Sequence, residues 1–82
     1  MTTWDYRVIE FETAAPGEAE PHRWRAIHEV FYNDAGQTVA YGENPAIVLW
    51  EVAEGNNSPS STLERMQMAL SKPALRAKEF YK

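Results

Sequence analysis

Polar and apolar residues alternate along much of the first half of the chain, as in strands with two unlike faces. The run Trp4–Phe11 places Trp4, Tyr6 and Val8 on one face, and its aromatic and β-branched residues favour a strand. A second strand is predicted over Trp24–Tyr32, and one of its faces carries Trp24, Ala26, His28, Val30 and Tyr32.

A turn and a third strand follow. Asn33–Gln37 combines side chains that bond their own backbone with a glycine that permits a left-handed conformation, so it predicts a hairpin turn. Thr38–Glu43 is the returning strand.

Mobile loops are expected over residues 12–22, which hold two prolines and three glutamates, and over residues 54–60. The apolar run Ala46–Val52 does not alternate, so it fits a strand buried on both faces or an extended segment crossing the end of the sheet.

One helix is predicted near the C-terminus. Ser61 and Glu64 have the spacing of a capping box. Helical spacing then places Leu63, Met66, Ala69 and Leu70 on one apolar stripe. Pro73 should end the helix at about Lys72, and so short a helix must pack on the sheet. The residues from Ala74 onward predict a turn or an edge strand.

These elements predict a single α+β domain over residues 1–82, with a three- to four-stranded, mainly antiparallel sheet and one C-terminal helix packed on one face. A chain of 82 residues buries a thin core, so pairing with a second copy would add stability.

Charge and composition exclude several function classes. The first 64 residues carry a net charge of −8, which disfavours nucleic acid, whereas residues 65–82 carry +4. The basic segment fits an acidic partner or the protein's own acidic sheet. The absence of cysteine excludes disulfides and thiolate chemistry. No signal-peptide pattern and no membrane-spanning apolar run are present, so a cytoplasmic protein without membrane contact is expected.

No catalytic, metal or cofactor site is expected. His28 and Glu29 are adjacent, but neighbouring strand residues point to opposite faces, so a dyad would need a bulge. His28 is better explained by packing than by binding or pH sensing. His22 and His28 lack partners at zinc-ligand spacing. The serines before the helix are explained by capping, and no glycine-rich phosphate loop exists.

Aromatic residues provide a candidate interaction surface. They exceed what one short helix can cover, and rings on an uncovered sheet face are typical of an interface. The turn after Tyr41 adds a candidate contact at a strand end. Stacking of single-stranded RNA is disfavoured by the acidic sheet. The predicted interaction surface comprises Trp24, His28, Tyr32, Tyr41, Glu43, Asn44 and Trp50.

Two blocks resemble a family of small bacterial proteins that has no assigned activity. They are IHEVFYNDAGQTVAYGENP, residues 27–45, and the helix end M-x-x-A-L-S-K-P-A-L, residues 66–75. The order of three strands and a helix also resembles HicB-type antitoxin domains, although their glycine-rich core pattern is absent. Both resemblances bear on the fold and leave function open.

The leading hypothesis is a non-enzymatic module that binds a protein partner, or forms a homodimer, through a sheet face or an edge strand. The alternative is an acidic regulatory or antitoxin-like protein that neutralises a basic, nucleic-acid-handling partner. A small-molecule enzyme is the third hypothesis.

Overall fold

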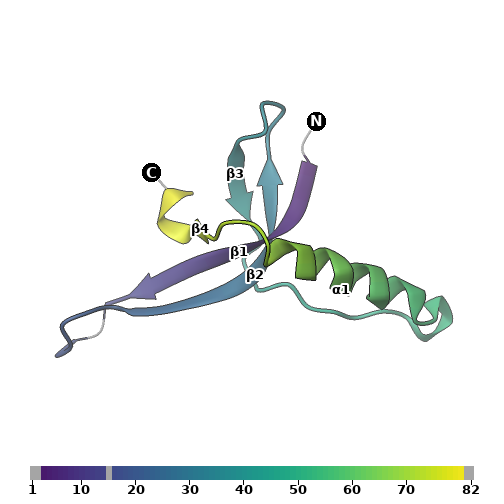
Figure 1. Ribbon diagram of the computed structural model, residues 1–82, viewed down its shortest axis with the longest axis horizontal. Coiled ribbons are helices and arrows are strands. Elements are labelled where there is room, and N and C mark those ends of the chain that lie inside the picture. The colour runs from purple at the N-terminus through teal and green to yellow at the C-terminus, as the bar shows by residue number, and fades with distance from the viewer. Residues whose placement is uncertain (1–2, 15, 81–82) are drawn as a thin grey trace.

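The computed structural model describes residues 3–14 and 16–80, which form one four-stranded sheet and one α-helix (Figure 1). In chain order the elements are β1 (Thr3–Thr13), β2 (His22–Tyr32), β3 (Thr38–Tyr41), the 3₁₀ helix η1 (Val52–Glu54), α1 (Asn57–Ala69), β4 (Leu75–Arg76) and the 3₁₀ helix η2 (Ala77–Glu79). The strand order is β3-β2-β1-β4, and only the β1–β4 pair is parallel. The α+β prediction is therefore confirmed, and the edge strand near the C-terminus is the fourth strand.

The pairing of β1 with β2 is longer than the hydrophobic pattern predicts. Its antiparallel register runs from Thr3 opposite Tyr32 to Thr13 opposite His22. Residues 12, 13 and 22, which were expected in a mobile loop, are therefore strand residues. The extension is polar, and it is supported by cross-strand ion pairs such as Glu12 with Arg23 at 3.4 Å. Hydrophobic periodicity carries no signal for such a strand end.

The predicted hairpin turn between β2 and β3 is confirmed. The Oδ1 atom of Asn33 accepts hydrogen bonds from the backbone N–H groups of Ala35 and Gln37, both at 3.0 Å. Gly36 has a φ of 79°, which explains the glycine at this position. The third strand ends at Tyr41, two residues earlier than expected.

Ala46–Val52 is not a strand buried on both faces, so that alternative is wrong. The segment is extended beside β2, and the Ala46 N–H donates to the Ile27 carbonyl at 2.8 Å. Ala46 and Val48 pack against the core. Ile47 and Leu49 point the other way and are 69% and 73% exposed. The side chains alternate between core and solvent even though all of them are apolar.

Helix α1 begins at Asn57, so the capping box predicted at Ser61 and Glu64 is wrong because both residues lie inside the helix. The helix also takes in four of the seven residues of the expected loop over residues 54–60. Pro59 marks a loop in the sequence, yet a proline fits the first helical turn, where its missing N–H needs no partner. The helix ends at Ala69, before the expected Lys72, and tight backbone turns follow.

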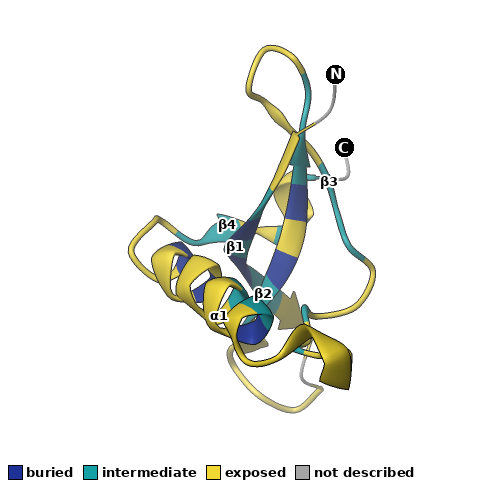
Figure 2. Ribbon diagram, turned by 90° about the vertical axis from the view of Figure 1, so that its right-hand side faces the viewer, coloured by how far each residue is buried: buried dark blue, intermediate teal, exposed yellow. Residues whose placement is uncertain are grey.

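The core between helix and sheet is small. It contains Tyr6, Met66 and Ala69, with Ile27, Ala46 and Val48 packed against them. Figure 2 shows buried positions along β1 and β2 and on one side of α1, while most of the helix surface is exposed. The predicted stripe is only half correct, because Leu63 and Leu70 are 54% and 67% exposed.

An electrostatic cluster around Asp5 fixes the end of the helix to β1. The Lys72 Nζ lies 2.8 Å from Asp5 Oδ2, and the Arg65 Nη2 lies 3.8 Å from Oδ1. The Arg65 guanidinium also covers the Trp4 ring at 4.3 Å. The basic C-terminal segment thus docks on the protein's own acidic strand.

The same cluster lowers the pKa of Asp5 below its ordinary value. Partial burial raises this pKa, but the hydrogen bonds from Lys72 and from the Tyr6 N–H lower it by more, together with the positive charges of Lys72 and Arg65.

Asp5→Asn is expected to destabilise the fold in a pH-dependent way. Because the pKa of Asp5 is lower in the folded state, its charge stabilises the fold above about pH 4, and this contribution is lost as the pH falls through the folded pKa. Since Asp5 is partly exposed, the loss should be about 0.5–1 kcal/mol at pH 7. Urea unfolding at pH 7 and pH 3, at one protein concentration, measures it. If Asp5→Asn lost the same free energy of unfolding at both pH values, the ionic role of Asp5 would be contradicted.

Met66→Ala and Met68→Ala form a matched pair that tests which side of α1 the sheet covers. Met66 is 9% exposed and Met68 is 62% exposed. Met66→Ala should lower the free energy of unfolding by about 2–3 kcal/mol, because it leaves a cavity in a small core. Met68→Ala should change it by less than about 0.5 kcal/mol. Equal losses in urea unfolding would show that the helix is packed differently.

Candidate functional site

The sheet face opposite α1 carries a continuous row of rings, defined here as the aromatic row. Directly paired residues of antiparallel strands share a face, so Phe11 lies beside Trp24. Successive ring centroids in the row are 5.0–5.6 Å apart. The row consists, in spatial order, of His22, Trp24, Phe11, His28, Tyr41 and Phe80. It links β1, β2, β3 and the C-terminal segment.

His28 is an internal member of this row. It is 2% exposed, and its Nδ1 lies 2.9 Å from the Gly42 carbonyl oxygen. Because a carbonyl only accepts, Nδ1 carries the proton in this bond. Glu29 is exposed on the opposite face. The two side chains therefore form no dyad, and a binding partner has no access to the His28 ring.

The C-terminal segment borders this face and partly covers it. β4 is the edge strand beside β1, where it pairs with Ile9 and Glu10, and further along the chain the Phe80 ring packs on Tyr41. The Arg7 Nη2 donates to the Pro73 carbonyl at 2.9 Å, which ties the segment to the sheet. Ile9 and Val30, whose side chains point to this face, are both 0% exposed. Part of the aromatic face that α1 leaves open is thus covered by residues of the same chain.

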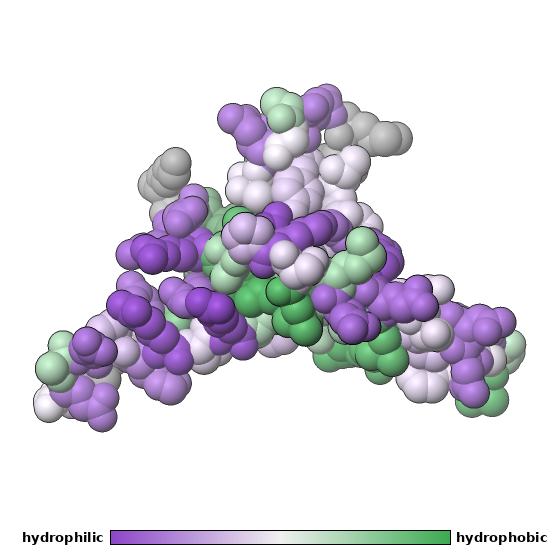
Figure 3. All heavy atoms as spheres, in the orientation of Figure 1, coloured by the Kyte–Doolittle hydropathy of each residue, from purple (hydrophilic) through white to green (hydrophobic). Residues whose placement is uncertain are grey.

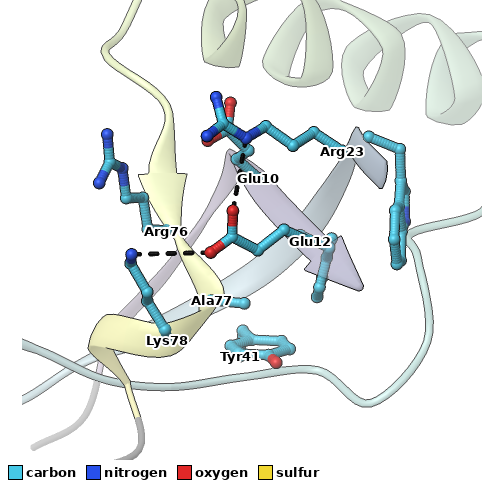
Figure 4. Close-up of a pocket in the computed structure, with 9 residues that line it drawn as sticks. Glu10, Glu12, Arg23, Tyr41, Arg76, Ala77 and Lys78 are labelled. Carbon is cyan, nitrogen blue, oxygen red and sulfur yellow. Dashed lines mark ion pairs between the residues drawn. The ribbon is translucent and has the colours of Figure 1, made fainter. Parts of the chain in front are cut away.

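A hollow remains at the edge of the aromatic row. Its volume is about 380 Å³, and Phe11, Trp24 and Tyr41 contribute the rings that line it. Glu12 pairs with Arg23 at 3.4 Å and with Lys78 at 3.7 Å across the opening (Figure 4). Arg76 extends away from Glu12 and Tyr41. Glu12, Arg23 and Lys78 at the hollow thus bind one another.

The predicted interaction residues do not form one surface. The structure brings Trp24, His28 and Tyr41 together in the aromatic row, with Trp24 still 43% exposed. Tyr32 lies further along β2, where its hydroxyl accepts a hydrogen bond from Arg7 at 3.1 Å.

Three of the predicted residues lie outside the aromatic row. Glu43 and Asn44 are exposed in the bend after β3, and Trp50 is 44% exposed beyond the sheet. Sequence analysis missed Phe11, His22 and Phe80 as members of the row. The strand register that would have placed Phe11 opposite Trp24 is hidden by the long loop between them.

A second candidate surface lies on what we call the helical arm, residues 46–70, comprising the extended segment, η1 and α1 with its cap Leu70. Figure 1 shows the helix and the segment before it extending together from the sheet. In Figure 3, hydrophobic residues lie between helix and sheet and along the lower side of the arm. Among the described residues, the arm holds seven of the ten exposed large hydrophobic side chains: Ile47, Leu49, Trp50, Val52, Leu63, Met68 and Leu70.

Comparison with protein-family models, with curated proteins and with solved structures found no match. Within residues 3–14 and 16–80, no helix has the length and apolar character needed to cross a membrane. In the same residues, no three His, Cys, Asp or Glu side chains are grouped so that they could hold a metal ion.

His28→Ala and Glu29→Ala test the packing role of the histidine. His28→Ala removes a buried ring and the donor to Gly42, so it should lower the free energy of unfolding by about 2–3 kcal/mol. Glu29→Ala, on the exposed face, should change it by less than about 0.5 kcal/mol. Thermal and urea unfolding measure both effects. A neutral His28→Ala would contradict a role in packing.

Proposed function

We propose that the protein is a non-enzymatic protein-interaction module and that the helical arm is its binding surface. The observation that carries this proposal is the gathering of exposed apolar side chains on the arm. Leu49, for example, is 73% exposed and Val52 is 96% exposed. A concentration of exposed apolar side chains on one part of a molecule is typical of an interaction surface.

The dimensions of the molecule support the proposal. Its radius of gyration is 15.2 Å, whereas a compact domain of this length has a radius of about 12 Å. Its accessible surface of 6345 Å² exceeds that of a compact monomer of 9.4 kDa by about 1,300 Å². An excess of this size exceeds the roughly 800 Å² that one partner buries in a standard interface.

The competing proposal of an acidic protein that neutralises a basic partner has less support. Asp5, Glu10 and Glu12 are already paired with cations of the same chain, at 2.8–3.8 Å. The most exposed apolar side chains lie instead on the arm, where a partner would bury hydrophobic surface. The proposed binding surface therefore differs from the aromatic sheet face that the sequence favours.

Site-specific photocrosslinking in cells distinguishes the arm from other exposed apolar positions. A benzophenone amino acid at Leu49 should yield covalent protein adducts, whether with another protein or with a second copy. The same amino acid at Val39, which is 48% exposed on β3, should yield few. Mass spectrometry of the adducts gives their identity. Equal labelling at both positions, or none at Leu49, would refute the arm as the binding surface.

A further inference from the structure

We propose that the partner of the helical arm is a second copy of this chain. Two copies would pack their arms about a two-fold axis, with one uncharged row of α1 at the centre of the interface. This inference rests on the proposed function, because it identifies the occupant of the same surface. The central row consists of Ser60, Leu63, Gln67 and Leu70.

Helical geometry places these four residues on one side of α1. They are separated by three, four and three positions, which is the spacing of a seam between two packed helices. Leu70 keeps a right-handed helical conformation as the C-cap residue, so it continues the row. The buried residues Met66 and Ala69 face the sheet, and the row lies beside them on the flank that the sheet leaves open.

The row suits a self-complementary interface because it lacks charge. Around a two-fold axis a patch meets its own copy, so a charged residue near the axis would face a like charge. The two charged residues of α1 are Glu64 and Arg65. Arg65 is turned away from the row, toward Asp5 and the Trp4 ring. Glu64 borders the row beside Gln67, so in the dimer it would lie at the solvent-exposed rim, where its charge is screened, and the two leucines of the row would not face a like charge.

The area also fits. Each copy exposes about 1,300 Å² more than a compact monomer, and this excess includes the β1–β2 hairpin as well as the arm (Figure 1). A standard interface takes about 800 Å² from each copy, which is less than this excess. Ile47 and Leu49 add apolar surface on the extended part of each arm. Such a dimer would also supply the burial that this small core lacks.

Light scattering coupled to size exclusion, with the full chain alone, tests the inference. The wild-type mass should be about 19 kDa, twice the chain mass of 9.4 kDa. Leu63→Glu and Leu70→Glu should weaken association about 100-fold or more, because each would bury a carboxylate against its copy. Val39→Glu is the control, since Val39 is 48% exposed on β3, outside the arm, and it should remain dimeric.

A second measurement is independent of whether the glutamate variants fold. The chain has no cysteine, so one introduced thiol is unique. Under mild oxidation Gln67→Cys should form a disulfide-linked dimer at low protein concentration, and Val39→Cys, on β3 outside the arm, should do so far more slowly. A wild-type mass near 9.4 kDa at every concentration, or equal crosslinking at both positions, would overturn the inference. If Leu49 adducts with another protein were still found, the proposed function would stand with a different partner.

Discussion

The antiparallel ladder between β1 and β2 is the interaction on which the rest of the structure depends. It pairs every residue of β1 with one of β2, from Thr3 to Thr13. Because it is central in the sheet, β1 has side chains buried on both faces. Tyr6 and Val8 point toward the helix side, whereas Ile9 points to the opposite face. β1 therefore contributes buried side chains to both sides of the sheet.

The two faces of the sheet are covered to different extents. On one face Phe80 completes the aromatic row, in which His28 is buried between Phe11 and Tyr41. On the other face α1 contributes only part of its apolar side. Asp5, through Lys72 and Arg65, holds the C-terminal end of the helix at β1, and the rest of the arm extends beyond the sheet. Because α1 is attached to the sheet at its C-terminal end, apolar side chains on the rest of the arm stay exposed.

Much of the fold could be predicted from local pattern. The three β-strands of the hairpins, the Asn33–Gln37 turn and the C-terminal helix all follow from alternation, turn chemistry and helical spacing. The errors have physical causes. Polar ion pairs extend β1 and β2 where periodicity gives no signal, and Pro59 is accommodated in the first helical turn.

The candidate site was harder to predict because it depends on long-range contacts. Sequence analysis identified an excess of aromatic residues, but not that Phe80 returns from the C-terminus to pack on Tyr41. It also assigned Leu63 and Leu70 to the core, because spacing alone shows that an apolar stripe exists and not how much of it the sheet covers. The exposure of the arm depends on how the helix packs on the sheet, which the sequence pattern does not show.

Amide hydrogen exchange of the wild-type chain at two protein concentrations tests most directly whether the arm is covered by another copy. Few arm residues are buried in the single chain, so α1 should open readily when the protein is dilute. The account predicts that protection of residues 57–70 rises with concentration, while protection of the β1–β2 ladder changes much less. Equal protection of the helix at low and high concentration would contradict it.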